Sequence, residues 1–410
     1  MWIVKRYHWL PLLLLIVTAS QAMVYDNRFI PLYPAPRLGV ECTKSAFIIS
    51  PMAATASKGF DNKQEDKGIG LPEIYGLLDL SDLAAGAEIV TGTNPLIPDK
   101  RGGQIPFHVD GKLQVQGVCL SLYHAITPHI SLGGSMAFLR ANSWHDFLIT
   151  ERPNVIVGQG ETFEDDRERV FNALGLQPGH WKSSGFGDID FYVRLGWGRG
   201  YVYKFRHIDA GVRFGVLIPT GQLRQENQPP SFSFGGDGHW GIYVALDALF
   251  EVKEDVKVGI LGRINQRFSR RTVRRVPVKN EPSIFGAACL PTDVDPGVTV
   301  IFSPYVVFEN LRDGLGGSIQ FTLVSHQRDS WKPDRSCIQA IPLNVCHAEE
   351  TSKWGSDYFT LNIFYDFGKM KPVRGLDPIL SLRWDLPSKM LVVNRVAKTH
   401  RLSLGLELAF

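Results

Sequence analysis

Apolar and polar residues alternate one by one over long stretches of this chain, above all from residue 187 onward. In the stretch 205–218, Val212 and Phe214 fall on one face. Asp209 and Arg213 fall on the opposite face of the same stretch. A period of two residues is typical of a β-strand whose two faces meet different surroundings, whereas a helix repeats every ~3.6 residues. The alternation therefore predicts an all-β protein.

The same alternation predicts about twelve strands, within a range of twelve to fourteen. They are expected at residues 38–50, 113–124, 130–141, 188–197, 205–218, 238–251, 256–269, 297–309, 315–326, 355–367, 377–386 and 400–410. Average strands in globular proteins have only about five or six residues. A strand that crosses a bilayer needs about 9 to 11 residues, apolar toward lipid and polar toward the lumen. Length and pattern together predict a transmembrane antiparallel up-and-down β-barrel.

The links between the predicted strands alternate between short and long. Short links are expected at 125–129, 198–204, 252–255 and 310–314, and long links at 142–187, 219–237, 270–296 and 327–354. Outer-membrane barrels join their strands by tight turns on the periplasmic side and by extended loops on the outer side. Counted back from the C-terminus, every one of these long links falls on the extracellular side, as this arrangement requires.

Two segments do not follow the strand pattern. Residues 51–112 are compatible with a short helix around 79–87, with a plug folded into the lumen, or with two more strands, and we keep these alternatives open. The stretch 162–181 predicts one helix inside an outer loop, stopped by Gly175. That helix is either a functional lid or an element that only stiffens the loop.

The first 22 residues have the layout of a secretory signal peptide. Lys5 and Arg6 precede a short apolar run, and Ser20 and Ala22 are small residues at the expected cleavage site. The alternative is an uncleaved N-terminal anchor, although the apolar run is short for a bilayer span. We therefore predict an exported protein with a signal peptide at 1–22 and an outer-membrane barrel at 23–410.

The last strand carries a complete apolar face up to the final residue of the sequence. A closed barrel needs such a face, because its last strand pairs with its first strand and meets lipid like the others. Ser403, Gly405, Leu408 and Phe410 also resemble the C-terminal signal that outer-membrane barrels present to their assembly machinery. The barrel assembly machinery is accordingly one expected partner.

Charged and polar residues on the inward faces are the candidate lumen lining. They are Asp190, Arg194, His207, Asp209, Arg213, Tyr243, Asp247, Glu251, Lys257, Arg263, Asn265, Arg267, Arg401 and Glu407. Opposite charges on neighbouring strands either line a selective polar path or pair with one another and close the lumen. A barrel of about twelve strands is narrow enough for side chains nearly to fill it, so both interpretations stay open.

One stretch resembles a known group of barrels. It is SGFGDIDFYVRLGW followed by HIDAGVRFGVLIPTGQ, with the sequence Gly-Phe-Gly-Asp at 185–188 and Ile-Pro-Thr-Gly at 218–221. These residues resemble the outer-membrane transporters grouped with meta-pathway phenol degradation, which are similar to fatty-acid transporter barrels. The resemblance implies passage of small, hydrophobic solutes across the outer membrane. The alternative is a structural or adhesive surface barrel with a closed lumen.

Composition adds little beyond this. The net charge of +3 is too small to indicate nucleic acid as a partner, and charged residues make up an ordinary 21%. The expected partners are outer-membrane lipid, lipopolysaccharide and a small-molecule solute, while the oligomeric state is not predicted. A cluster of basic residues in the outer loop 270–279 is compatible with lipopolysaccharide contact or with a solvated basic loop; its members are Arg270, Arg271, Arg274, Arg275 and Lys279.

Five cysteines occur in the chain, without the spacing of a metal site. Cys337 and Cys346 lie close together in a loop-like segment, so a disulfide is one interpretation in an oxidising compartment and two free thiols is the other. We expect no metal and no organic cofactor.

Catalysis is considered because some outer-membrane barrels are hydrolases. A nucleophile and its base must lie within hydrogen-bond reach. His326 and Ser330 do not have the spacing of the outer-membrane phospholipases, and His145 beside Asp146 is only a weak hint of a protease site. We therefore predict that the protein is not an enzyme.

Overall fold

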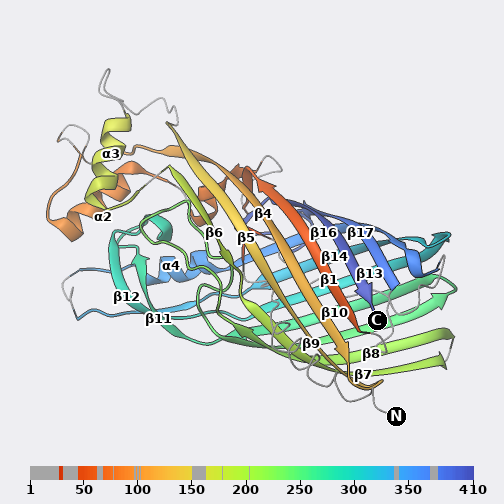
Figure 1. Cartoon of the computed structure of the whole chain (residues 1–410). Helices are drawn as coiled ribbons and strands as arrows, with labels where there is room; N and C mark the ends of the chain where they lie inside the picture. Colours follow the sequence, from red (N-terminus) through yellow and green to blue (C-terminus); the bar gives the residue numbers. More distant parts are fainter. Residues whose placement is uncertain are drawn as a thin grey trace, which may run out of the picture.

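Twelve strands of the described residues close into an antiparallel β-barrel, seen from the side in Figure 1. The computed structural model describes residues 27–30, 45–61, 68–76, 78–96, 98, 101, 103–149, 163–177, 179–202, 204–336, 341–369 and 377–410. The barrel strands are β1 (Ala46–Ala56), β4 (Phe107–Ala125), β5 (Ile130–Ile149), β7 (Ile189–Val202), β8 (Phe205–Ile218), β9 (Gly241–Lys253), β10 (Val256–Arg267), β13 (Thr299–Arg312), β14 (Leu315–His326), β16 (Trp354–Asp366), β17 (Asp377–Ser388) and β19 (His400–Ala409). Strand β1 pairs with both β4 and β19, so the sheet closes on itself. The predicted class of fold is confirmed.

The first strand differs from its prediction. It was expected at 38–50, but β1 runs from Ala46 to Ala56 and continues through Pro51. The ladder between β1 and β19 is interrupted at Ser50 and Pro51. The missing N–H of proline therefore removes no hydrogen bond there, and a proline that would end most central strands is tolerated.

Each barrel strand buries one face and exposes the other, as the alternation predicts. On the outer face, Phe214 is 51% exposed, Leu246 59% and Ile264 55%. Inward-facing neighbours such as Asp190 and Arg263 are buried. So much exposed apolar surface is rare on a protein surrounded by water. It forms a belt around the barrel that fits lipid as its solvent.

Tight turns connect the strands at one end of the barrel, which we call the turn end. Strands β13 and β14 are joined through Asp313 (φ 40°) and Gly314 (φ 89°). An Asp-Gly pair suits a two-residue hairpin because both positions need positive φ, which these residues tolerate. Between β9 and β10, Asp255 has a positive φ (61°) and the ladder is irregular at Val256 and Lys257. The N-terminal end of β1 and the C-terminal end of β19 pair at this end as well.

The long loops lie at the opposite end, the loop end, and fold together there (Figure 1). We call their elements the loop cap: β2 (Lys58–Phe60), β3 (Ile69–Gly70), η1 (Leu71–Tyr75), α2 (Leu80–Thr91), α3 (Phe163–Ala173), β6 (His180–Phe186), β11 (Arg270–Val276), η3 (Ser283–Phe285), β12 (Ala288–Asp295), β15 (Ser330–Pro333), α4 (Val345–Ser352) and β18 (Val396–Ala397). A further short helix, η4 (Phe367–Lys369), follows β16 at the turn end. In the part of the chain that is described, no helix combines the length and apolar character needed to cross a membrane.

The loop cap has a hydrophobic core of its own. Leu83 of α2, Phe171 of α3 and Phe285 of η3 belong to one buried cluster, although they come from three different loops. The Phe171 and Phe285 rings stack with centroids 5.8 Å apart. Helix α3 confirms the helix predicted in this loop, and Gly175 follows it with φ 63°, the left-handed conformation expected at a helix end.

Residues 51–112 are now resolved into several elements. Helix α2 confirms the alternative of a helix around 79–87. The two ends of the segment belong to barrel strands β1 and β4, and β2 and β3 are short strands outside the barrel. At the barrel mouth, Leu71 of η1 packs among inward-facing residues of β4 and β5, including Leu113 and Ala137.

The described N-terminal residues 27–30 lie in the same region. Asn27 Nδ2 donates a hydrogen bond to the Ser233 carbonyl at 2.7 Å, and Ala397 N donates to the Arg28 carbonyl at 2.9 Å. Ile30 is fully buried in the cluster at the mouth. The predicted signal peptide lies outside the described residues.

Candidate functional site

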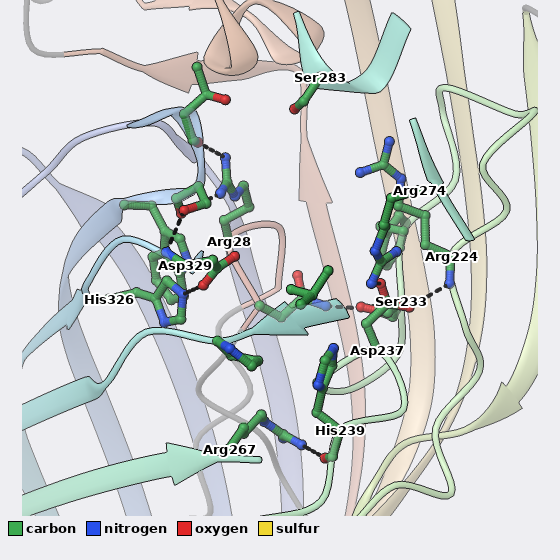
Figure 2. A pocket seen from close by; sticks show the side chains of 18 of the residues that line it. Arg28, Arg224, Ser233, Asp237, His239, Arg267, Arg274, Ser283, His326 and Asp329 are labelled. Carbon is green, nitrogen blue, oxygen red and sulfur yellow. Dashed lines mark hydrogen bonds and ion pairs between the residues drawn. The ribbon is translucent and has the colours of Figure 1, made fainter. Parts of the chain in front are cut away.

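The loop-end pocket is the cavity that we consider as the functional site. It has a volume of about 170 Å³ and opens among the loop cap and the ends of β10, β14 and β16. Figure 2 shows Arg28, Asp329 and His326 on one side of it and Arg224, Arg274 and Asp237 on the other. The lining residues come from segments that are far apart in the sequence, from Asn27 to Trp354.

A buried carboxylate organises the floor of this region. Asp188 connects β6 to β7, and its oxygens accept hydrogen bonds from Gly221 N at 3.0 Å and Gly236 N at 2.8 Å. Arg267 at the end of β10 donates to the same carboxylate at 2.9 Å. A Cβ on Gly235 would lie 2.3 Å from the Asp188 Cγ, and a Cβ on Gly221 only 2.6 Å from its Oδ1. The glycines are therefore needed because the backbone approaches the carboxylate so closely.

Two acids that line the pocket are already bound by neighbours. Asp237 pairs with Arg274 and accepts a hydrogen bond from Arg224 N at 3.0 Å. Burial acts to raise the pKa of Asp237, but Arg274 and the backbone hydrogen bond from Arg224 together hold the pKa below its usual value. Asp329 accepts hydrogen bonds from His326 Nε2 and from Gly297 N, both at 2.9 Å.

Aromatic rings form part of the wall of the pocket. The Phe29 centroid lies 5.4 Å from that of Phe232 and 6.2 Å from that of Tyr75. Trp331 and Trp354 also line the cavity. The pocket therefore combines several aromatic rings with a lining that is otherwise mostly polar and charged.

Toward the turn end, charged side chains pair across neighbouring strands. Arg194 contacts Asp209 at 2.9 Å and Asp247 at 2.6 Å, and Arg213 contacts Asp247 at 2.9 Å. These four residues come from β7, β8 and β9. Such a cluster cross-links the wall from inside and occupies space in the lumen.

In two further clusters inside the barrel, buried charged side chains are also paired. Asp190 accepts a hydrogen bond from Tyr243 Oη at 2.7 Å and pairs with Arg263 at 3.2 Å. On the opposite part of the wall, Asp385 pairs with Arg401 at 2.6 Å and accepts from Thr360 at 2.5 Å. Buried charges require partners of this kind, because an unpaired charge is costly to bury.

The structure brings most of the predicted lumen residues together. The three inner clusters and the Asp188 anchor include Asp190, Arg194, Asp209, Arg213, Tyr243, Asp247, Arg263, Arg267 and Arg401. Asn265 accepts a hydrogen bond from Arg263 at 2.5 Å. Nearer the turn end, Lys257 pairs with Glu309 at 2.9 Å and Glu251 lies 3.7 Å from Arg206. His207 and Glu407 are half-buried. That these residues line a path for solute stays a prediction.

Sequence reasoning missed Asp188, Asp385 and Arg383. Arg383 lies 3.3 Å from Asp385 on the inner face of β17. The signal was present, because Leu382 and Trp384 alternate with them and are exposed on the outer face. Asp188 was part of the Gly-Phe-Gly-Asp stretch, but its role depends on two glycines that follow it at a distance in the sequence.

The structure corrects the interpretation of the basic loop 270–279. Arg275 is buried and donates hydrogen bonds to the carbonyls of Glu226 at 2.7 Å and Gly286 at 3.1 Å. Arg274 is buried and pairs with Glu226 at 2.7 Å. Both interpretations, a solvated loop and a surface for lipopolysaccharide, are therefore wrong for these two residues. Both residues are buried within β11, whereas Arg271 is exposed.

Cys346 on α4 carries a free, exposed thiol in the structure. Cys337 lies outside the described residues, so the disulfide between them stays a prediction. Within the described ranges, no group of His, Cys, Asp and Glu could hold a metal ion.

Comparison with known proteins bears on the fold. No family model matches the chain, and no curated protein sequence matches it. An outer-membrane channel from Pseudomonas putida F1 is similar in structure, with a TM-score of 0.50 and 11% identity over 92% of this chain and 100% of the other. The translocator domain of the autotransporter NalP from Neisseria meningitidis has a TM-score of 0.37 and 8% identity, over 90% of this chain and 88% of the other. A mutant form of the TodX monoaromatic hydrocarbon channel has a TM-score of 0.36 and 8% identity, over 96% of this chain and 97% of the other. The first of these shows the fold, an outer-membrane-type barrel.

Proposed function

We propose that this protein is an outer-membrane channel through which small, hydrophobic solutes pass. The carrying observation is a closed barrel with an apolar outer belt and a pocket at the loop end whose wall includes aromatic rings. An apolar belt requires lipid, and a pocket at one mouth gives a solute a first place to bind. The name of the structural neighbour, an outer-membrane channel, supports the same proposal at the level of fold.

The loop cap then faces the outside of the cell, because extended loops lie on the outer side of such barrels. The apolar belt makes outer-membrane lipid a partner. The last strand supports recognition by the barrel assembly machinery, since Ser403 and Gly405 are buried and Phe410 is 58% exposed at its end. Lipopolysaccharide remains a proposed partner through exposed residues of the cap.

A closed surface barrel is the second candidate. The observation that favours it is the pairing of charges inside the barrel, above all around Arg194 and Asp247. In that case the barrel would only display the loop cap. The two candidates differ in conductance, because paired charges that fill the lumen would block ions and solutes.

A catalytic role is disfavoured by side-chain placement, and we propose that the protein is not an enzyme. His145 is buried while Asp146 is exposed, because successive residues of β5 point to opposite faces. Thr299, His326 and Asp329 form a hydrogen-bonded row, with a Thr299 Oγ1 to His326 Nδ1 distance of 2.8 Å. Thr299 is only 1% exposed, so a substrate cannot reach its hydroxyl.

Planar-bilayer recording of the purified full-length protein tests the proposal. We expect single-channel conductance from the wild type and a larger conductance from the double variant Arg194→Ala/Asp247→Ala, because the variant removes side chains that occupy space in the lumen. Arg271→Ala, which changes an exposed residue of the loop cap, is the matched control and should leave conductance unchanged. If neither the wild type nor the double variant conducts, and liposomes do not swell, the closed-barrel candidate replaces the channel.

A further inference from the structure

The loop-end pocket is lined by four arginines, and two of them lack a carboxylate partner. Arg267 and Arg274 form the ion pairs described above. Arg28 and Arg224 form no ion pair with any described residue, although both line the cavity. Neither guanidinium therefore has a carboxylate in direct contact among the described residues.

Arg28 is held in place by neutral groups. Its guanidinium donates to the carbonyl oxygens of Thr351 at 3.2 Å and Ser352 at 2.7 Å. Burial lowers the pKa of Arg28; attraction by Tyr75 and Asp329 acts against this, and repulsion from Arg395 and Arg224 adds to it. An anion that reached this guanidinium would offset part of the cost of burial and of the repulsion.

Arg224 lies near the same place. The Cζ atoms of Arg28 and Arg224 lie 4.8 Å and 5.8 Å from the centroid of the Tyr75 ring, so one ring positions both cations. Among the described residues, the buried Nε of Arg224 has no hydrogen-bond partner. A buried donor without a partner is uncommon and is a reason to look for a ligand.

The nearby acids do not satisfy these two cations. Asp329 attracts Arg28 only from beyond ion-pair distance, and its Oδ1 already accepts two hydrogen bonds. Asp237 accepts from the backbone N–H of Arg224, while its side-chain partner is Arg274. Neither acid therefore contacts the guanidinium of Arg28 or of Arg224.

Size and wall chemistry limit the rest of the ligand. An engineered apolar cavity of about 150 Å³ holds one benzene molecule, and this pocket has about 170 Å³. Phe29 and Phe232 provide an aromatic wall beside the cations. A single ring that carries one carboxylate matches the volume, the wall and the charge together.

We propose that the loop-end pocket binds a small aromatic carboxylate, with its carboxylate between Arg28 and Arg224 and its ring against Phe29 and Phe232. This inference rests on the proposed function and narrows the solute from hydrophobic molecules in general to amphipathic anions. Arginine suits the role because its planar fork matches a carboxylate in two hydrogen bonds.

Benzoate is the probe, and benzamide is its uncharged match. We would titrate each into the purified full-length protein in detergent and follow tryptophan fluorescence, because Trp331 and Trp354 line the pocket. Saturable binding of benzoate is expected, with benzamide at least ten-fold weaker. Arg28→Gln and Arg224→Gln should each weaken benzoate about 10- to 100-fold, as expected for loss of a charge-assisted hydrogen bond.

Arg224→Lys should retain part of the affinity for benzoate, because lysine keeps the positive charge but cannot make the two parallel hydrogen bonds of a guanidinium. Arg271→Gln, with the same change of charge on the exposed side of the loop cap, should stay within two-fold of the wild type. Heat-modifiable mobility on gels confirms that each variant is a folded barrel. Equal binding of benzamide, no saturable benzoate binding by the folded wild type, or unchanged affinity in both Gln variants would overturn the proposal.

Conductance measured on the same preparations separates this inference from the proposed function. If the barrel conducts but does not bind benzoate, only the proposed aromatic-carboxylate site is refuted. If the barrel binds benzoate through Arg28 and Arg224 but does not conduct, the proposed channel function is refuted and the proposed binding site is retained.

Discussion

Replacement of Asp188 by asparagine is expected to lower the free energy of unfolding by about 3 to 5 kcal/mol, the usual cost of breaking a buried ion pair. The Asp188 side chain is fully buried and that of its partner Arg267 is 3% exposed, so solvent cannot replace the lost charge. The carboxylate also accepts two backbone hydrogen bonds, from Gly221 and Gly236, and asparagine can keep only part of this set.

A double variant separates the cost of the unpaired Arg267 charge from the cost of the lost backbone hydrogen bonds. If the cost comes mainly from the uncompensated charge of Arg267, then Asp188→Asn combined with Arg267→Met should recover at least half of it, because no buried charge remains. Asp334→Asn, at an exposed ion pair of the loop cap, is the control and should leave stability unchanged.

The assay is a urea titration of the full-length protein in lipid vesicles, read by tryptophan fluorescence in both directions to establish reversibility. A loss below 1 kcal/mol for Asp188→Asn would refute the anchoring role of this carboxylate. A double variant as unstable as the single one would show that the backbone hydrogen bonds, and not the charge, carry the energy.

Three further outcomes are expected. Gly235→Ala should sharply reduce the yield of folded barrel, because its Cβ would lie 2.3 Å from the anchoring carboxylate, whereas Gly262→Ala meets nothing within 4 Å and should fold normally on gels. Leu246→Arg, in the middle of the lipid-facing belt, should cost about 2 to 4 kcal/mol in urea titrations, and Leu311→Arg beside a turn only about 0 to 1 kcal/mol; equal costs would contradict the assigned depth. Burial acts to raise the pKa of Asp329, but its hydrogen bonds hold the pKa below 3.8, so it stabilises the fold above that pH and this stability is lost as pH falls through the lower, folded value. Asp329→Asn should therefore flatten the dependence of unfolding free energy on pH below about 4, and parallel curves would contradict this.

The strands could be predicted because their signal is local. Leu402 and Leu404 face outward and Arg401 and Ser403 face inward, as the alternation requires. The predicted bounds were wrong at β1, which was expected at 38–50 and instead runs through Pro51 to Ala56. Whether a proline is tolerated depends on the hydrogen bonds of the neighbouring strand, which sequence does not show.

The candidate site could be predicted only in part. Inward charges on β7 to β10 were identified, because each strand shows its own polar face. The pocket was not, because Arg28, Arg224 and Asp329 come from three segments without regular pattern. The burial of Arg274 and Arg275 was missed for the same reason, since a run of basic residues in a loop is usually solvated.

The sequence by itself determined the kind of protein, because period-two alternation over long strands and the sorting of short and long links are properties of neighbouring residues. Only the tertiary structure decided which charges meet. Arg194 and its partner Asp209 are 15 positions apart, and Arg267 and Asp188 are 79 apart. Barrel closure and the packing of the loop cap set such distances, and both depend on contacts between segments that share no local pattern.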